Sequence, residues 1–458
     1  MNNIVYSVNS RPPFGKIILS AFQQLLAILA ATIAVPAIIG NGMSQSAALF
    51  GAGIGTLIYL LFTRMKSPVF LGSSFAFLGS MAAAFSGAAT VAMGYTGLII
   101  GACLAGIVYC IFSLLVKLFG TGWINRLMPP IVIGPTVAII GLSLAPNAIG
   151  DLRLGNVIVE GNVVANPNVC ILVDIITLIA VIIFSVLAKT SIRMFPFIIG
   201  MGVGYAIAAI LTLIGNLSGF DKIQIIDFSL FNNIKWIPDF TFIKAFQGFK
   251  DFSNAGEFFK YFGAIAVSYI PVSFVVFAEH IADHKNLSSI IGEDLLDKPG
   301  LHRTLLGDGV GSFAGALFGG CPNTTYGESI ACVAISGNAS SMVTLVTALI
   351  AIVVSFFGPF VTFLATIPKC VMGGVCIALY GFISVSGLKM LKEVDLSENK
   401  NVFVISTILI TGVGGLVLQF NHIEIRTVAC ALVLGIIVNL LVNHKRKEKP
   451  AEEENNEA

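Results

Sequence analysis

Two acidic side chains lie within or beside long apolar stretches, where a carboxylate is rarely found. Glu279 closes the apolar run that starts at Tyr261, and Glu328 lies between turn-forming residues that begin at Pro322 and another apolar stretch. A carboxylate at the centre of a lipid bilayer costs about 2.5–3.5 kcal/mol on insertion scales, so such acids usually face a polar cavity and mark an ion or substrate path. The alternative for Glu279 is an interfacial acid at a helix end.

Two segments combine extended, turn-forming residues with a following apolar helix. One is Pro322-Asn-Thr-Thr-Tyr-Gly, directly before Glu328, and the other runs from Ser67 to Phe77. Irregular backbone is tolerated at membrane depth only where protein or a water-filled cavity satisfies it. Two helix N-termini that meet there would offer free N–H donors and positive dipole ends. With carboxylate acceptors and an aromatic ring nearby, this set suits a small planar heterocycle with alternating N–H and C=O groups.

Other polar residues carry weaker signals. His280 and His284 flank Asp283 at a spacing seen in metal sites, but no further set of ligands is evident, so we expect neither a metal nor a cofactor. Asp174 and Asp308 lie close to predicted helix starts, which favours capping or interfacial positions. The eight cysteines form no CxxC pair and are interpreted as small apolar side chains. No phosphate-binding loop motif is present, so transport would be driven by a gradient.

Composition decides which class of protein must position these groups. Of the 458 residues, 56% are hydrophobic and 11% are charged, and the mean hydropathy is +0.92. Soluble proteins carry roughly 25% charged residues, so a soluble enzyme, a nucleic-acid-binding protein and a disordered scaffold are excluded. The chain is predicted to be an all-α protein that crosses a membrane many times.

Stretches of about 20 mostly apolar residues, the length that spans a bilayer, occur repeatedly along the chain. Eleven clear ones fall near 16–39, 46–64, 97–116, 128–146, 168–188, 195–216, 261–280, 341–366, 371–388, 402–419 and 425–443. Three more, near 68–88, 303–319 and 321–337, are short or interrupted, which raises the predicted count to fourteen. Interrupted segments in both halves of a chain point to a transporter's binding site, and the similar helix starts at Met128 and Ile367 also suggest a repeat.

An even number of spans places both termini on one side of the membrane. Most of the 26 lysines and arginines then fall in loops on that side, which predicts cytoplasmic termini in a bacterial inner membrane. The long loop 217–256 would lie outside. The tail 444–458 is charged and lacks apolar periodicity, so it is predicted to be disordered.

At these residues the chain resembles the bacterial uracil permeases of the nucleobase–ascorbate transporter (nucleobase–cation symporter) family, along almost its whole length. The matching stretches include Leu71-Gly-Ser-Ser-Phe-Ala-Phe77, Ala278-Glu-His280, Pro299-Gly-Leu-His-Arg303, Pro322-Asn-Thr-Thr-Tyr-Gly-Glu328 and Val371-Met-Gly-Gly374. The resemblance implies fourteen transmembrane segments in two inverted seven-segment repeats, with short strands in segments 3 and 10. It also implies a core domain of residues 1–118 and 257–367, and a gate domain of residues 119–256 and 368–443.

The resemblance also assigns roles by position. It implies a substrate-binding site formed by Phe75, Glu279, Tyr326, Gly327, Glu328 and Tyr380. The two glutamates would bind a uracil ring through their carboxylates, and the backbone N–H groups of Phe75 and Gly327 would hold its carbonyls. Glu279 would also carry the coupled proton, and Asp283, which stands where relatives often have histidine, is a second proton-coupling candidate. Gln24, Ser329 and Ala331 also depart from the family pattern and leave fine specificity open.

The resulting prediction is a proton-coupled uracil symporter, not an enzyme, that works by alternating access in the cytoplasmic membrane. Its expected partners are uracil, protons and the lipid bilayer, without nucleic acid, and the sequence is compatible with a homodimer. Two other functions remain open. One is a carrier of the same fold for xanthine, urate or another small anion, and the other is a channel or membrane metalloenzyme.

Membrane orientation gives the first testable prediction. In a background without the native cysteines, a cysteine placed in the 217–256 loop should react with a membrane-impermeant thiol reagent added to intact cells. A cysteine placed after Lys449 should react only once the membrane is opened. The opposite pattern would invert the orientation, and labelling of both positions from outside would contradict an even number of spans.

Overall fold

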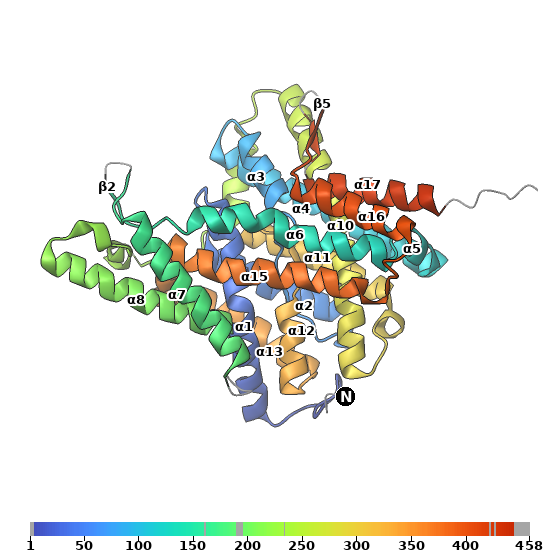
Figure 1. The fold of residues 1–458 in the computed structure, drawn as a ribbon, viewed down its shortest axis with the longest axis horizontal. Helices are drawn as coiled ribbons and strands as arrows, with labels where there is room; N and C mark the ends of the chain where they lie inside the picture. Colours follow the sequence, from blue (N-terminus) through green and yellow to red (C-terminus); the bar gives the residue numbers. More distant parts are fainter. Residues whose placement is uncertain are drawn as a thin grey trace, which may run out of the picture.

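The structure is a computed structural model of the chain, and it describes residues 4–159, 162–188, 196–232, 234–420, 423–425 and 427–443. Within these residues the chain is mostly helical, and its strands form three separate two-stranded pairs (Figure 1). The predicted disordered tail, 444–458, lies outside the described residues.

Fourteen helical segments follow the predicted apolar stretches. The helices in the described part that are long and apolar enough to cross a membrane number eight: α1 (Phe14–Ile39), α2 (Gln45–Phe62), α4 (Val91–Phe119), α6 (Pro130–Asp151), α7 (Pro167–Val186), α8 (Pro196–Ser218), α10 (Ala255–Ile291) and α15 (Lys369–Lys389). The others are shorter or follow a strand: α3 (Leu78–Ser86) after β1 (Leu71–Ser73), α11 (Leu301–Gly319), α12 (Gly327–Ser336) after β4 (Asn323–Thr325), α13 (Ser341–Ser355), α16 (Asn399–Val413) and α17 (Thr427–Val442). The predicted fold class, with strands in segments 3 and 10, is confirmed.

Proline sets the start of two long helices at corresponding places in the two halves of the chain. The short helix α5 (Gly122–Leu127) precedes α6, whose first residue is Pro130. Likewise, α14 (Gly358–Thr366) precedes α15, whose N-cap is Pro368. Proline suits a helix start because its fixed φ is helical and its missing N–H is not needed there. The similar sequences at Met128 and Ile367 therefore mark matching elements of the repeat.

The structure corrects several predicted boundaries. The stretch 341–366 is not one continuous helix, because α13 and α14 meet at an angle of 84° where Gly358 and Pro359 interrupt the helix. Helix α10 continues well beyond Glu279, so this residue is not the interfacial acid of a helix end. The 217–256 loop contains a helix, α9 (Thr241–Gly248), packed against α4. The hairpins β2–β3 (Ile158–Val159, Asn162–Val163) and β5–β6 (Leu418–Phe420, Ile423–Ile425) were too short to predict.

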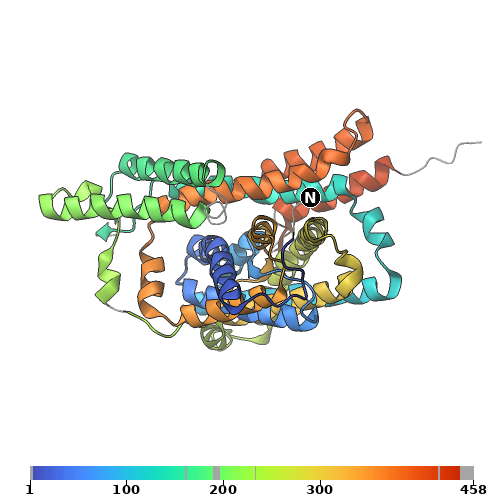
Figure 2. The same cartoon turned by 90° about the horizontal axis from the view of Figure 1, so that it is seen from below.

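The long helices form two layers (Figure 2). In one layer α2 and α11 pack together, with α1, α4, α10 and α13 around them. In the other, α6 packs against α15 and α16, while α7 and α8 pack against each other and α16 packs against α17. The short helices α5 and α14 stand where the chain passes from the first layer to the second. Each layer thus combines segments from both halves of the sequence.

Glycine allows α2 and α11 to approach until their backbones touch. A Cβ atom on Gly51 would lie 2.3 Å from the carbonyl oxygen of Gly315, and one on Gly55 would lie 2.7 Å from that of Gly311. Small residues at a helix interface permit such close packing within a membrane. The contact matters for function because the two strands β1 and β4 lie against these same two helices.

Candidate functional site

The two predicted extended segments pair with each other between α2 and α11. Strands β1 and β4 run antiparallel, with Leu71 opposite Thr325 and Ser73 opposite Asn323, and every strand residue is buried. Their backbone groups therefore find partners within the protein, as membrane depth requires. Asn323 Nδ2 also donates to the carbonyl oxygen of Gly51 at 3.1 Å, which fixes β4 on α2.

Tyr326, the residue after Thr325 at the end of β4, packs against β1. Its ring covers Gly72, where a Cβ atom would lie 2.3 Å from the ring carbon Cζ. Its hydroxyl donates to the carbonyl oxygen of Ser73 at 2.9 Å. Any side chain at position 72 would displace this ring, so glycine is required there by close approach.

Each strand leads to a backbone N–H group for which the described residues provide no acceptor. Gly327 is the first residue of α12, so its N–H has no acceptor within the helix. A Cβ atom built on Gly327 would meet nothing within 4 Å, so this helix start faces open space. Phe75 lies in the turn between β1 and α3, where its carbonyl accepts from Leu78 N at 3.1 Å, while its own N–H makes no hydrogen bond to the described residues.

Three carboxylates lie near the start of α12. Glu279 and Asp283 are one turn apart on α10, and Glu328 is in the first turn of α12. All three are half-buried and close enough to interact electrostatically. Thr325 of β4 donates its hydroxyl to Asp283 Oδ2 at 2.6 Å, which ties α10 to the strand pair. Negative charges this close repel one another, so a proton or a ligand N–H group that shields one of them stabilises the site.

The two histidines of α10 are committed to hydrogen bonds away from these carboxylates. His280 Nδ1 lies 2.7 Å from Asp308 Oδ2 of α11, and His284 Nε2 lies 2.7 Å from the hydroxyl of Tyr59 of α2.

The expectation that Asp308 caps a helix or lies at the interface is wrong, because its side chain is buried and belongs to the middle of α11. The same correction applies to Asp174, which is buried within α7.

A chain of polar contacts links α1 to the strand pair. Gln24 Nε2 donates to Ser329 Oγ at 2.8 Å, and Gln24 Oε1 accepts from the Thr347 hydroxyl of α13 at 2.8 Å. Ser329 Oγ in turn accepts from the backbone N–H of Phe70, directly before β1, at 3.1 Å. Gln24 thus holds the first turn of α12, which carries Glu328, against α1, α13 and the segment entering β1.

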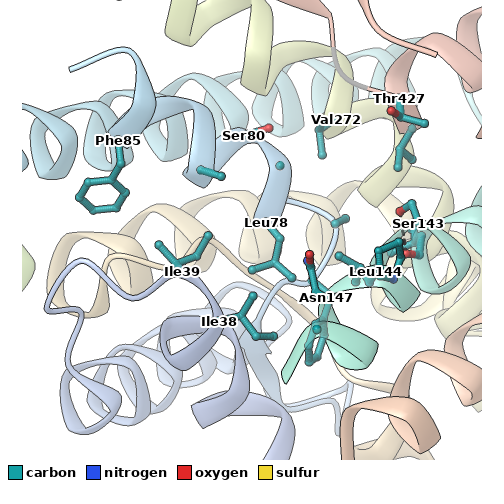
Figure 3. A pocket seen from close by; sticks show the side chains of 18 of the residues that line it. Ile38, Ile39, Leu78, Ser80, Phe85, Ser143, Leu144, Asn147, Val272 and Thr427 are labelled. Carbon is teal, nitrogen blue, oxygen red and sulfur yellow. Dashed lines mark hydrogen bonds between the residues drawn. The ribbon is translucent and has the colours of Figure 1, made fainter. Parts of the chain in front are cut away.

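A cavity of about 860 Å³ reaches this region from between the two layers. Figure 3 shows part of its lining, contributed by α1, α3, α6, α10 and α17: Ile38, Ile39, Leu78, Ser80, Phe85, Ser143, Leu144, Asn147, Val272 and Thr427. Phe75 also lines the cavity, whereas Glu279, Asp283 and Glu328 do not. The ring of Phe75 meets Tyr380 of α15 edge to face, with centroids 5.6 Å apart. A residue that lines the cavity, Phe75, thus also contacts the second layer.

The structure thus brings the residues of the predicted site together in two connected groups. Glu279, Asp283, Tyr326, Gly327 and Glu328 surround the strand pair, and Phe75 links this group to Tyr380. Their roles in binding and proton coupling stay predictions. Sequence reasoning missed Thr325 as the partner of Asp283 and Asp308 as the partner of His280. An acid within an apolar helix was the available signal for Asp308, but its pairing with His280 joins residues 28 positions apart.

Comparison with known proteins identifies consistent relatives. The permease family matches residues 15–420. The chain is 36% identical over 447 residues to the uracil permease of Bacillus caldolyticus, covering 96% of this chain and 95% of that protein. It is 33% identical over 443 residues to the uracil permease of Escherichia coli K12, covering 96% and 94%. The transmembrane domain of the cyanobacterial bicarbonate transporter BicA shares the fold, with a TM-score of 0.59 and 16% identity, covering 95% of this chain and 99% of that one.

The Gln24 contacts predict a measurable loss of stability. Gln24→Leu removes the amide that joins Ser329 to Thr347, while Thr347 keeps the carbonyl oxygen of Val343 at 2.8 Å. Each lost hydrogen bond should cost about 0.5–1.5 kcal/mol. We expect a lower midpoint of thermal unfolding in detergent and, because Glu328 is less well held, weaker ligand binding. Gln23→Leu is the matched control, since Gln23 lies next to it on α1 and outside this chain of contacts. Equal unfolding midpoints for both variants would contradict the structural role of Gln24.

Proposed function

Because this chain belongs to the permease family and is a multi-pass membrane transporter rather than an enzyme, we propose that it imports uracil together with a proton across the bacterial cytoplasmic membrane. The observation that carries this proposal is the meeting of Glu279 and Glu328 with the open helix start at Gly327. The names of the relatives, uracil permeases of two bacteria, support the choice of substrate.

The donors and acceptors of this region complement a uracil ring. Uracil presents two N–H groups, which the carboxylates of Glu279 and Glu328 can accept in charge-assisted hydrogen bonds. Its two carbonyl oxygens can accept from the free N–H groups of Phe75 and Gly327, where the positive end of the α12 dipole adds to the attraction. Tyr326 and Tyr380 supply aromatic surface for the ring faces.

Proton coupling follows from the charges of the same cluster. A proton on Glu279 relieves repulsion from Asp283 and Glu328, which lie within electrostatic range. Uracil binds the protonated and the ionised cluster with different free energies. Both oxygens of an ionised carboxylate accept hydrogen bonds, whereas a protonated carboxyl group also carries a donor. By linkage, uracil then alters proton affinity by the same factor as protons alter uracil affinity. Asp283 is the second candidate for the proton because it is one turn away on α10.

Alternating access would move the two layers relative to each other. We assign the layer that contains β1 and β4 to a core domain, from residues 1–118 and 257–367, and the layer of α6 to α8 and α15 to α17 to a gate domain, from residues 119–256 and 368–443. The cavity between the layers supports this division, since residues of both layers line it, among them Phe75 and Leu144. With cytoplasmic termini, this cavity lies on the outer side, because α1 ends at it.

Radiolabelled uracil uptake into proteoliposomes, with and without an imposed pH gradient, tests this function. We expect concentrative uptake only when the entry side is more acidic. Competition with xanthine, urate and bicarbonate separates uracil transport from transport of another small molecule by the same fold. Uptake that does not depend on the pH gradient would contradict proton coupling. Selective competition by xanthine would identify xanthine, not uracil, as the substrate.

Glu328→Gln tests substrate contact. The amide keeps the size of the side chain but replaces one acceptor oxygen with a donor. Loss of one charge-assisted hydrogen bond should cost about 1.5–3 kcal/mol, or roughly a tenfold to hundredfold loss of uracil affinity. Binding is measured by calorimetry in detergent, with Glu293→Gln, an exposed acid after α10, as the control. Unchanged affinity in a folded Glu328→Gln protein would remove this residue from the site.

Glu279→Gln tests proton coupling, because it mimics a permanently protonated carboxyl group. The variant should exchange uracil across the membrane but should not accumulate it when the outside is acidified, since it releases no proton inside. Asp283→Asn and the double variant are measured in parallel. If Glu279→Gln still concentrates uracil as the parent does, while Asp283→Asn does not, the coupling residue is Asp283.

A further inference from the structure

A buried imidazole–carboxylate pair lies next to the carboxylate cluster. His280 Nδ1 and Asp308 Oδ2 are 2.7 Å apart, and their side chains are 0% and 1% exposed. The pair joins α10 to α11 in the interior of the layer that carries both strands. The hydrogen bonds around it restrict where its hydrogens can be.

Thr304 lies against one ring nitrogen of His280. Its hydroxyl oxygen is 3.0 Å from the carbonyl oxygen of Leu301 and 3.0 Å from His280 Nε2. A hydroxyl has only one hydrogen to donate, so Thr304 either donates to Leu301 and accepts from a hydrogen on Nε2, or donates to a hydrogen-free Nε2. In the first arrangement another hydrogen lies between Nδ1 and Asp308, on the ring or on the carboxyl group. The pair then contains one proton more than a neutral imidazole and a carboxylate, and its net charge is zero.

The neighbouring histidine has the opposite arrangement. His284 Nδ1 donates to the carbonyl oxygen of His280 at 2.8 Å, and Nε2 lies 2.7 Å from the hydroxyl of Tyr59, which can donate to it. The Tyr59 oxygen lies 2.7 Å from Ser67 Oγ, which can donate to it. These contacts fit a neutral His284, which stacks on His280 with ring centroids 4.1 Å apart. A neutral partner at this distance does not oppose a positive charge on His280.

The surroundings favour keeping the extra proton. Asp308 Oδ1 has no hydrogen-bond partner among the described residues, so an ionised Asp308 beside a neutral His280 would be a poorly solvated buried charge. The titratable groups around the pair come from four helices: Tyr59 of α2, Tyr109 of α4, Glu279, Asp283 and His284 of α10, and Glu328 of α12. On α11 itself, Arg303 lies five residues before Asp308, at the opening turn of the helix. Apart from Arg303 and the neutral His284, these groups are acids or phenols, so they favour a proton on the pair.

We propose that His280 and Asp308 form a second proton-binding site, which holds one proton throughout the transport cycle and does not exchange it with the transported proton. Both residues belong to the same layer, so movement between the layers leaves their contact intact. The pair then adds no net charge to the cluster, and Glu279, Asp283 and Glu328 are the acids left to respond to pH. The part of this proposal that concerns the cycle rests on proton-coupled transport, whereas the occupancy of the pair does not.

Nitrogen-15 NMR of purified protein labelled at the histidine rings tests the occupancy directly. We expect His280 to keep a hydrogen on Nε2 from acid to alkaline pH, and His284 to remain the neutral form with its hydrogen on Nδ1. His280→Gln and His284→Gln assign the signals. A His280 Nε2 without hydrogen at neutral pH would overturn the proposal. This result does not depend on uracil transport, so it is distinguishable from failure of the proposed function.

Proton titration of Asp308→Asn and Asp283→Asn tests the lack of exchange. Asp308→Asn should take up the same number of protons as the parent between mildly alkaline and mildly acidic pH, because the pair is neutral in both proteins. Asp283→Asn should take up one proton fewer. The pH midpoint of uracil uptake should likewise stay unchanged in Asp308→Asn. Loss of a titrating proton in Asp308→Asn, or a displaced midpoint, would show that the pair exchanges its proton. If Asp308→Asn does not fold, the NMR measurement still decides the occupancy.

Discussion

Backbone that leaves helical geometry at membrane depth must find hydrogen-bond partners in protein, and here β1 and β4 find them in each other. Most of the site follows from this pairing. Because the strands satisfy one another, the helix start at Gly327 can remain open to a ligand without exposing the rest of the segment. The glycines of α2 and α11 and the single glycine under the Tyr326 ring provide the space that the pairing needs. A larger side chain at any of these contacts would separate the strands and move the helix starts apart.

The acids of this region divide according to what surrounds them. Asp308 is fully buried and has a histidine at hydrogen-bond distance. Glu279, Asp283 and Glu328 are half-buried near the start of α12. Burying an ionised carboxylate without a partner costs free energy, so a fully buried acid needs a fixed partner. A half-buried acid can instead be neutralised by a proton or by a ligand. The division therefore separates a structural charge pair from groups that are free to respond to solution, although all four lie close together.

Local sequence was sufficient for the features that depend on local physics. Apolar length located the long helices, and two acids in apolar surroundings indicated the candidate site, whose role stays a prediction. The family resemblance, rather than periodicity, supplied the strands, because three residues are too few to show alternation. Contacts between distant residues were not predictable: the strand register, the hydrogen bond from Thr325 to Asp283 and the link from Gln24 to Ser329 across 305 positions. Asp174 and Asp308 were misplaced because an acid near an apparent helix start resembles a cap.

The distribution of contacts constrains how the site can change. Glu279, Asp283 and Glu328, the open helix starts and the strand pair all belong to one layer, whose helices touch backbone to backbone. Tyr380 comes from the other layer and meets Phe75, which lines the cavity, through an edge-to-face ring contact. Relative movement of the layers can therefore alter the aromatic cover of the site without changing its polar geometry. Because an edge-to-face ring contact contributes only about 0.5–1.5 kcal/mol beyond its area burial, it can open and close at small energetic cost, whereas rearranging the strand pair would break several buried hydrogen bonds together.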